Sequence, residues 1–344
     1  MTKFSVKELI PASLRKLVPD KIKRTIKDKL IVKTPLEKDV ALFILEGKRF
    51  TPPLSDFPPM VMIDTTTRCN LTCEHCPNSA LSEVKDFLGD MEDDLVYKIL
   101  DEIAREAPDT LTRLFNGGEP LMRKDLKDHI QYAREKGIKA VSINTNGTML
   151  VKSRRQGIIE AGLTHIEVSV DAFTPETYLK IRKSTLFDRV VQNTLDFIQE
   201  SKAHNPENQV TVSMVLQTDN RHEHEQFLAF WEPKVDHVYI REYHQHNANV
   251  DDHGLFKNHG NPRRHPCPFL WDRIIVNHDG MVRFCEFDWM GEHALGDAKE
   301  NTLKEIWQGE AFTRLRESHV EGTFCHEFCK NCTDWRQINW NGMK

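Results

Sequence analysis

The sequence lacks three features that would place the protein in a membrane, outside the cell or on nucleic acid. It has no run of 18 or more apolar residues, so no transmembrane helix is predicted. Its first apolar stretches are short and interrupted by Pro11 and Pro19, so no secretory signal is predicted either. Its net charge is −5, which gives no basic bias toward nucleic acid. We therefore expect a cytoplasmic protein whose substrates and partners do not include nucleic acid.

The eight cysteines are the most informative residues that are present. Without a secretory signal they favour metal ligation over disulfide bonds, because a reducing compartment keeps thiols free. Three of them, Cys69, Cys73 and Cys76, form a C-x3-C-x2-C cluster. Structural zinc sites take four protein ligands, and four-iron clusters normally take four cysteines. Three thiolates therefore predict a four-iron cluster in which one iron is open to another ligand.

Composition and pattern divide the chain into three parts. The first part, residues 1–50, starts with a basic stretch, since residues 1–34 hold ten Lys or Arg against three Asp or Glu. Apolar residues recur there at near-helical spacing, which indicates a basic amphipathic helix that contacts an anionic membrane surface or a partner. The alternative is a helical extension that packs on its own domain or is partly disordered. We expect the main domain over residues 51–245, and a linker with a smaller domain over residues 246–344.

Short apolar segments alternate with helical patterns six times from residue 58 onward. This alternation predicts an α/β fold with a parallel sheet and right-handed crossovers. The strands are expected at residues 61–64, 111–115, 140–143, 165–170, 210–215 and 238–240. The helices are expected near residues 91–106, 124–136, 151–161, 186–203 and 222–231.

Polar residues follow most of these strands at the point where each ends. They are Gly117, Gly118 and Glu119, then Asn146, then Ser169 and Asp171, and finally Arg241, Glu242, Tyr243 and His244. Any one of these loops could be an ordinary turn. The carboxyl ends of parallel strands meet at one rim, however, so these residues should gather there with the cysteines.

The order of these motifs resembles the radical S-adenosylmethionine (SAM) superfamily over roughly residues 58–245. The matching motifs are C-x3-C-x2-C, Gly-Gly-Glu-Pro, Thr-Asn-Gly and Ser-Val-Asp, while His75 stands where an aromatic residue is common. The resemblance implies a partial (β/α)6 TIM-like barrel. It also implies that Cys69, Cys73 and Cys76 hold a [4Fe-4S] cluster whose open iron binds SAM, and that a donor such as flavodoxin or ferredoxin supplies electrons.

The same resemblance implies SAM-binding roles for residues on the rim. These residues are Gly117, Gly118, Glu119, Asn146, Ser169, Asp171 and Arg182. The two glycines would let the backbone approach the ligand, and Glu119 would help hold the methionyl ammonium group. Ser169 and Asp171 would bond the ribose hydroxyls. Arg182 would hold the SAM carboxylate, or would be a solvated charge on a helix.

The other five cysteines are all near the C-terminus. A hairpin turn at residues 277–280 would bring Cys267 and Cys285 together, and a helix is expected at residues 302–317. Residues 266–336 resemble a SPASM or shortened twitch domain, which implies one auxiliary [4Fe-4S] cluster held by Cys267, Cys285, Cys329 and Cys332. Cys325 would be spare, would replace one of these ligands, would act as a base or temporary substrate ligand, or would be an inert thiol. A structural zinc site is the alternative for the set.

An auxiliary cluster with four protein ligands could accept an electron from a substrate radical. We therefore expect a net oxidation of a sugar- or cyclitol-like alcohol, in which Glu242 or His244, or else Arg241, takes the hydroxyl proton. The polar residues 241–265 would line the mouth of the barrel. A radical SAM peptide maturase that forms cross-links or epimerised residues is the enzymatic alternative. A metal-stabilised binding module is the non-catalytic one.

Overall fold

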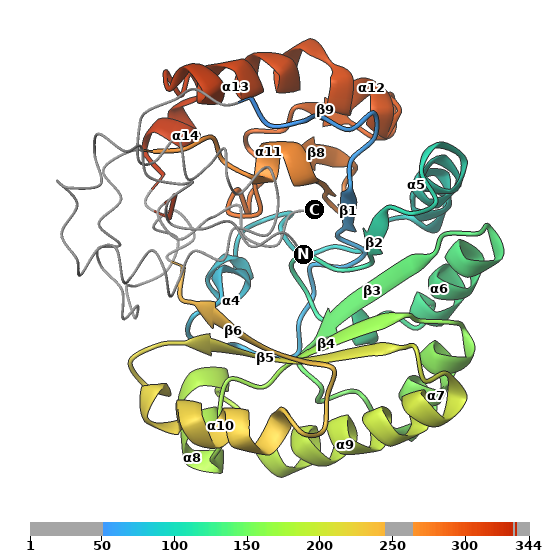
Figure 1. Cartoon of the computed structure of the whole chain (residues 1–344), viewed down its shortest axis with the longest axis vertical. Helices are drawn as coiled ribbons and strands as arrows, with labels where there is room; N and C mark the ends of the chain where they lie inside the picture. Colours follow the sequence, from blue (N-terminus) through green and yellow to red (C-terminus); the bar gives the residue numbers. More distant parts are fainter. Residues whose placement is uncertain (1–50, 245–263, 333, 336–344) are drawn as a thin grey trace, which may run out of the picture.

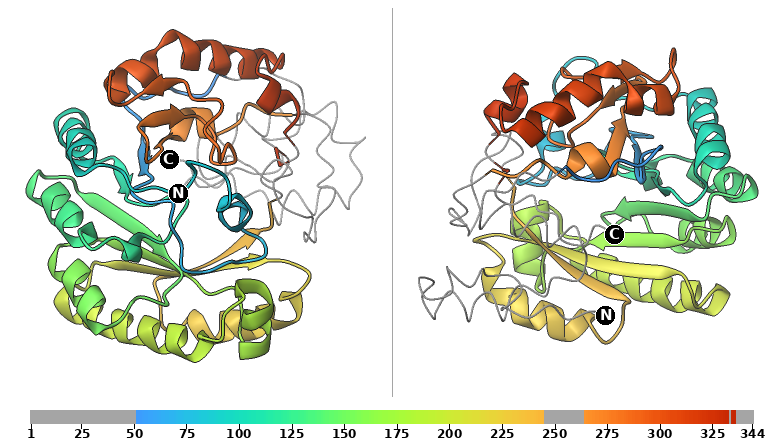
Figure 2. Two further views of the ribbon diagram at one scale, coloured as in Figure 1. Left: turned by 180° about the vertical axis from the view of Figure 1, so that it is seen from behind. Right: turned by 45° about the horizontal axis from the view of Figure 1, so that its top comes forward.

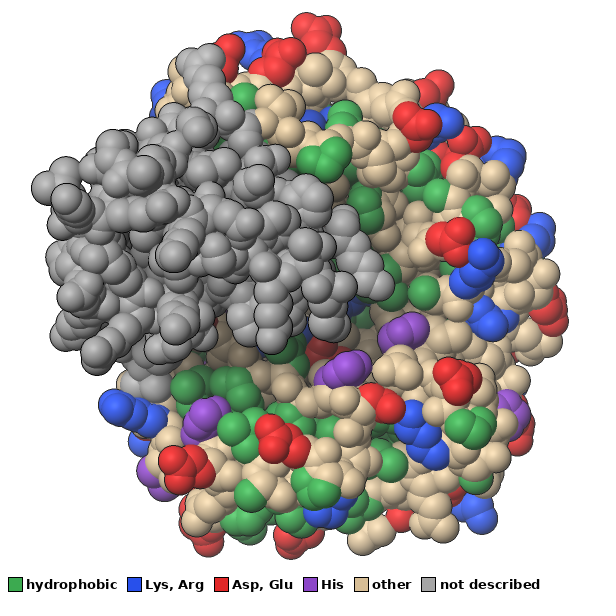
Figure 3. Space-filling model, in the orientation of Figure 1, with side chains coloured by type: hydrophobic (Ala, Val, Ile, Leu, Met, Phe, Trp, Pro, Cys, Tyr) green, Lys and Arg blue, Asp and Glu red, His purple; other side chains and the backbone are tan. Residues whose placement is uncertain are grey.

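The computed structural model of the protein describes residues 51–244, 264–332 and 334–335. The basic extension at residues 1–50 and most of the predicted mouth segment lie outside the described residues. Within them, no helix is both long and apolar enough to cross a bilayer. Acidic and basic side chains are interspersed over the described surface that Figure 3 shows.

Six parallel strands form an open barrel, and each pairs with the next in chain order. They are β1 (Met60–Ile63), β2 (Leu111–Arg113), β3 (Ala140–Thr145), β4 (His165–Ser169), β5 (Gln209–Leu216) and β6 (His237–Glu242). All six predicted strands are present, and Figure 1 shows the helices that connect them packed outside the sheet. The predicted partial TIM-like barrel is therefore confirmed.

The helices that connect the strands begin and end within about two residues of their predicted positions. They are α5 (Asp93–Glu106), α6 (Leu126–Glu135), α7 (Lys152–Glu160), α9 (Phe187–His204) and α10 (His224–Trp231). The helix predicted near residues 222–231 is preceded by, and overlaps, η2 (Arg221–Glu223). Three further short elements of the barrel were not predicted: α4 (Pro77–Leu81), η1 (Pro120–Met122) and α8 (Pro175–Arg182). Of these, α8 is eight residues long and is capped by the preceding Thr174, whose hydroxyl accepts a hydrogen bond from the Thr177 amide. Its apolar pattern is too short to stand out in the sequence.

The strands separate an apolar outer face from a polar inner face. Residues of β3, β4 and β5 that point toward the helices belong to the main hydrophobic core; they are Val141, Ile143, Ile166, Val168, Val210, Val212 and Met214. Successive side chains of a strand point to opposite faces. The inner face of the same strands therefore carries Ser142, Asn144, His165, Glu167, Thr211 and Ser213. The inner face of these three strands is therefore largely polar, with Val215 as an apolar exception beside Arg241.

The C-terminal region continues the barrel sheet. It contains α11 (Phe269–Asp272), β7 (Arg273–Val276), β8 (Met281–Arg283), β9 (Gly296–Asp297), α12 (Leu303–Gln308), α13 (Glu310–Glu321) and α14 (Glu327–Lys330). The predicted hairpin is present as β7 and β8, which pair antiparallel. β7 also pairs in parallel with β1, so one nine-stranded sheet runs in the order β6-β5-β4-β3-β2-β1-β7-β8-β9. The views in Figure 2 show α12 and α13 packed over this added part of the sheet.

The single helix predicted over residues 302–317 is wrong in one respect, because the structure has two helices there. Gly309 ends α12 and precedes α13, and its ψ of 163° is extended rather than helical. A break of this kind is consistent with the low helix propensity of glycine.

Candidate cofactor and metal sites

Cys69, Cys73 and Cys76 lie together in the loop that follows β1. The Cys76 amide donates to the Cys73 carbonyl at 3.2 Å, and the three thiols interact electrostatically with one another. Burial raises the pKa of Cys69 to about 11 and that of Cys76 to about 12. Thiolates in this loop would need a cationic partner, and an iron–sulfur core supplies one.

The Gly-Gly-Glu segment after β2 packs directly on the cysteine loop. The Gly118 amide donates to the Thr66 carbonyl at 3.1 Å, and the Glu119 amide donates to the Arg68 carbonyl at 2.7 Å. A Cβ atom on Gly118 would lie 2.4 Å from the carbonyl oxygens of both Thr66 and Arg68. The close approach that glycine permits at this position is therefore to the backbone of the cysteine loop.

Glu119 is buried and joins the ends of β2 and β3. Its carboxylate accepts hydrogen bonds from the Leu121 amide at 3.1 Å, the Thr145 hydroxyl at 2.7 Å and the Asn146 amide at 2.7 Å. Burial raises the pKa of Glu119. The Asn146 side chain in turn donates to Asn70 at 2.9 Å and has its amide nitrogen 3.9 Å from the Cys69 sulfur. Both residues thus fix the rim around the cysteine loop, and their contact with SAM stays a prediction.

Arg182 is buried beside Cys73. The alternative prediction, that it is a solvated charge on a helix, is therefore wrong. It is 7% exposed, with Nη1 3.6 Å from the Cys73 sulfur and Nη2 2.6 Å from Asp171 Oδ2. Burial opposes its charge, but the Asp171 carboxylate raises the pKa of Arg182. A cation in this position can hold an anionic ligand beside the cluster loop.

Asp171 is fully buried and already has partners on both carboxylate oxygens. Oδ1 accepts from the Val215 amide at 2.7 Å, and Oδ2 pairs with Arg182 and lies 3.5 Å from His75 Nε2. Asp171 therefore positions Arg182. The predicted hydrogen bond to the ribose of SAM would be a further contact of a carboxylate that already has partners. Ser169 is half-buried, with its hydroxyl 3.4 Å from that of Ser213.

Tyr178, which is one turn before Arg182 on α8, was not predicted as a site residue. Its side chain is fully buried, its hydroxyl has no hydrogen-bond partner among the described residues, and it interacts electrostatically with Arg182 and Cys73. Burial raises the pKa of Tyr178 to about 12, so the hydroxyl remains a donor. The four-residue spacing from Arg182 could have suggested it, but only once α8 was known.

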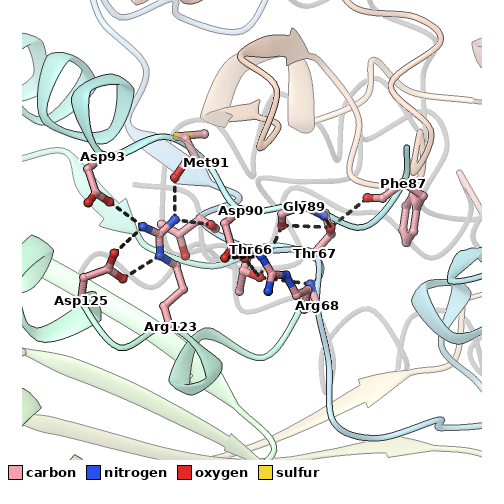
Figure 4. Close-up of polar contacts among 11 residues, drawn as sticks. Thr66, Thr67, Arg68, Phe87, Gly89, Asp90, Met91, Asp93, Arg123 and Asp125 are labelled. Carbon is pink, nitrogen blue, oxygen red and sulfur yellow. Dashed lines mark hydrogen bonds and ion pairs between the residues drawn. The ribbon is translucent and has the colours of Figure 1, made fainter. Parts of the chain in front are cut away.

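A buried arginine supports the start of the cysteine loop, as Figure 4 shows. Arg123 donates to the carbonyls of Thr65 and Met91 at 2.9 and 2.6 Å and to the carboxylates of Asp93 and Asp125 at 2.5 and 2.7 Å. These two carboxylates lie near His129 in a group that resembles a metal site. The guanidinium already satisfies them, so the group is a structural one.

The interior of the barrel holds a charged pair below the rim. Arg241 makes a two-pronged ion pair with Glu167, with Nη2 2.9 Å from Oε2. Despite burial, Arg241 lowers the pKa of Glu167 to about 2, and Glu167 raises the pKa of Arg241. Arg113 lies on the same face and donates to Asn144 at 2.6 Å. Arg241 stays protonated in this pair, so the structure disfavours it as a base and favours an orienting role.

The two other candidate bases lie at the end of β6. His244 is half-buried, with Nδ1 3.6 Å from Asp334 and its ring 5.2 Å from that of Phe287, so it lies between the barrel and the C-terminal domain. Glu242 neighbours Arg241 along the strand, and strand alternation directs it away from the inner face that Arg241 shares with Glu167. His244 is therefore the better placed of the two.

Cys267, Cys285, Cys329 and Cys332 line one cavity in the C-terminal domain. Burial raises the pKa of Cys329 to about 12 and raises the pKa of Cys267 and Cys285 still further. Four neutral thiols that face one another in an apolar cavity fit a cationic metal core, which would stabilise their thiolates. Cys325 is exposed and is not among the residues that line the cavity.

Two residues of the predicted mouth segment belong to this cavity instead. Arg264 and His265 line it, and Arg264 donates to the Cys329 carbonyl at 2.6 Å and stacks on Phe324 at 4.0 Å. His319 also lines the cavity and was not singled out in the sequence. Arg264 and His265 are adjacent and just precede Cys267, but His319 lies more than 50 residues further along the chain and reaches the cavity only after folding. No short sequence motif could have found them together.

Comparison with known proteins identifies two matching family models. A model of the radical SAM superfamily matches residues 63–230, and a model of the SPASM iron–sulfur cluster-binding domain matches residues 267–333. An Fe-coproporphyrin III synthase of Methanosarcina barkeri is 39% identical over 129 residues, which cover 37% of this chain and 30% of that protein. A probable GTP 3′,8-cyclase of Methanosarcina mazei is 39% identical over 121 residues, 35% of each chain. The match thus spans about a third of these relatives.

Two solved structures share the fold. BtrN in complex with AdoMet and 2-DOIA has a TM-score of 0.56 at 20% identity, covering 82% of this chain and 94% of its own. SuiB of Streptococcus suis bound to precursor peptide SuiA has a TM-score of 0.63 at 14% identity, covering 94% of this chain and 83% of its own. At these identities the similarity establishes the architecture and leaves the substrate open.

Proposed function

Because the chain belongs to the radical SAM superfamily and carries a SPASM iron–sulfur domain, we propose that it oxidises an alcohol carbon of a small, sugar- or cyclitol-like substrate. The observation that carries the proposal is the polar interior of the barrel beneath the cysteine loop. Arg113, Asn144 and the Glu167–Arg241 pair line it. Hydroxyl groups can both donate to and accept from such side chains.

The cofactors of this family fit the residues present. Cys69, Cys73 and Cys76 would hold the cluster that binds SAM, and Cys267, Cys285, Cys329 and Cys332 would hold one auxiliary cluster. When bound, these groups would supply a 5′-deoxyadenosyl radical that takes a hydrogen atom from a substrate C–H, and an acceptor for the electron that remains. Among the described residues, which include all eight cysteines, the first site has no fourth thiol. An external ligand such as SAM would complete it.

The residues around the first site would bind and orient SAM. Arg182, held by Asp171, would pair with the SAM carboxylate. Gly117, Gly118, Glu119 and Asn146 would shape the pocket for the methionyl group, and Ser169 would contact the ribose. An electron donor such as flavodoxin or ferredoxin would reduce the enzyme.

Conversion of the alcohol to a ketone also requires loss of the hydroxyl proton. His244 would take that proton, because it lies between the barrel and the C-terminal domain beside the Asp334 carboxylate. A positioned base typically contributes about 10²–10⁴-fold in rate. Replacement of His244 by Gln should therefore slow ketone formation by at least about 100-fold.

The experiment uses anaerobically reconstituted enzyme, dithionite, SAM and a panel of cyclitols and sugars deuterated at carbinol carbons. A true substrate should place deuterium in 5′-deoxyadenosine and yield a ketone. Cys73→Ala should abolish both, while the exposed-cysteine control Cys325→Ala should keep both. His244→Gln should retain deuterium transfer and lose ketone. Uncoupled SAM cleavage with every polyol, together with deuterium transfer from a peptide, would replace this proposal with a peptide maturase.

A further inference from the structure

His319 is a buried histidine in the last turn of α13 that faces the cavity of the four C-terminal cysteines. Its side chain is 2% exposed, and it lines the cavity together with Cys267, Cys285, Cys329 and Cys332. Its ring also packs edge-on against Phe324, with the centroids 4.9 Å apart. The packing fixes the plane of the ring and therefore the direction of both nitrogens.

The hydrogen bonds of the ring determine which nitrogen carries the proton. The Cys267 backbone amide donates to Nδ1 at 3.1 Å, so Nδ1 is an unprotonated acceptor. A ring whose Nδ1 accepts a hydrogen bond carries its proton on Nε2, so Nε2 is the donor.

This Nε2–H group has no partner among the described residues. Buried donors are nearly always paired, because an unpaired one loses its hydrogen bonds to water without replacement. The other polar residues of the cavity are already engaged. Arg264 donates to the Cys329 carbonyl, and His265 Nδ1 lies 2.9 Å from the Pro266 carbonyl oxygen.

We propose that Nε2–H of His319 donates a hydrogen bond to a sulfur atom of the auxiliary iron–sulfur cluster and raises the reduction potential of that cluster. Hydrogen bonds to the sulfurs are one of the factors that set the potential of such clusters. A donor partly neutralises the charge on sulfur, so it stabilises the reduced form, which carries one more negative charge, more than the oxidised form. His319 is thus a positioning residue that favours electron uptake.

The inference rests on the auxiliary cluster that the SPASM domain binds, and not on the identity of the substrate. It fits the proposed oxidation, in which this cluster accepts the substrate electron. Its test uses no substrate, so failure of one proposal leaves the other standing.

Two conservative variants separate the two nitrogens of the ring. In His319→Asn the side-chain oxygen can replace Nδ1 as acceptor for Cys267, but nothing replaces the Nε2 donor. In His319→Gln the amide nitrogen can replace the Nε2 donor, but the acceptor is lost. Each is made in the Cys69→Ala/Cys73→Ala/Cys76→Ala background, where only the auxiliary cluster remains, and iron content confirms equal loading.

The reduction potential is measured by redox titration followed by electron paramagnetic resonance. We expect His319→Asn to shift the potential downward and His319→Gln to stay close to the parent. Equal potentials in all three proteins would overturn the proposal. Loss of iron from both variants would also overturn it, because His319 would then hold the cluster or the Cys267 backbone in place.

A spectroscopic measurement tests the proposal even if the variants do not fold. Pulsed electron paramagnetic resonance of the reduced auxiliary cluster, in protein labelled with ¹⁵N-histidine, should detect one weakly coupled nitrogen with an exchangeable proton. A strong coupling would indicate that His319 ligates iron directly, and absence of coupling would show that no histidine contacts the cluster. Either result would contradict the hydrogen bond.

Discussion

A side chain at position 118 would collide with the backbone of the cysteine loop. The distance of 2.4 Å from the missing Cβ to the carbonyl oxygens of Thr66 and Arg68 leaves no room for even a methyl group. Both oxygens belong to backbone, so relief would require movement of the loop that carries Cys69. Gly118 therefore allows the cysteine loop to adopt its observed backbone position, in addition to its predicted role beside SAM.

Replacement of Gly118 by Ala should disrupt the first cluster and spare the second. We expect a protein that retains about four irons and fails to cleave SAM. The measurement is iron content together with 5′-deoxyadenosine formation.

Gly157→Ala is the matched control, because Gly157 is in α7 and its added Cβ would meet only Lys127 Cδ at 3.6 Å. This control should keep both clusters. Its free energy of unfolding should rise by about 0.5–1 kcal/mol, because alanine favours a helix interior more than glycine does. Full activity in Gly118→Ala would contradict the packing argument.

Single residues differed in how well the sequence predicted them. The C-x3-C-x2-C spacing indicated Cys69, Cys73 and Cys76 as one group, because all three are within one short loop. Arg182 was ambiguous, since a charged residue late in a helix is usually solvated. Only the fold shows that α8 directs it toward Cys73 and Asp171. Tyr178 and His319 had no local signal, because their significance depends on burial and on a missing hydrogen-bond partner.

The elements of the barrel were predictable, whereas their connection to the C-terminal domain was not. Alternation of strand and helix predicts the parallel sheet, since each crossover follows a fixed hand. Nothing in the segment at residues 273–276 indicates that it would pair in parallel with β1. That pairing depends on two segments more than 200 residues apart, and apolar character alone does not specify a partner strand.

Contacts between α5 and the segment around the start of α12 join the barrel to the C-terminal domain. The buried carboxylate of Glu102 accepts hydrogen bonds from the first two amides of α12, Leu303 and Lys304, both at 2.9 Å. Lys98, one turn earlier, donates to the carbonyls of Ala298 and Lys299 at 2.7 Å. A helix N-terminus favours an anionic partner, so Glu102 adds to the capping box that Thr302 and Glu305 already form at the start of α12.

Replacement of Glu102 by Ala should loosen α12 while the barrel stays folded. Loss of charge-assisted hydrogen bonds to buried amides costs about 2 kcal/mol. We therefore expect amide exchange in residues 303–308 to accelerate by about 30-fold, with β3 and β4 unchanged. Hydrogen–deuterium exchange measures this directly. Glu106→Gln serves as the control, because Glu106 contacts the same helix through a partly exposed ion pair with Lys304, which should contribute less than about 1 kcal/mol. Equal acceleration in the two variants would refute the role of Glu102.

The whole molecule should hold two clusters in separate sites. Reconstituted protein is expected to bind about eight irons, and the Cys69→Ala/Cys73→Ala/Cys76→Ala variant about four. A Cys267→Ala/Cys329→Ala variant should also bind about four. Cys325→Ala should match the parent, since Cys325 lies outside the cavity.

Metal analysis with iron, sulfide and zinc assays checks these counts. Zinc in place of iron in the triad variant would show that the C-terminal cysteines form a structural zinc site. A loss of iron in Cys325→Ala would instead make Cys325 a ligand. Both outcomes are distinct from misfolding, which circular dichroism would detect.

Because it extends the barrel sheet, the C-terminal domain covers a strand edge of the barrel in addition to carrying the auxiliary-cluster cysteines. β7 satisfies the hydrogen-bonding edge of β1 that faces away from β2. A chain ended after the barrel would present that edge to solvent, and an uncovered strand edge invites pairing with other chains. Exchange of this domain between related enzymes should therefore preserve the pairing of β7 with β1, because a mismatched partner strand would leave the β1 edge exposed.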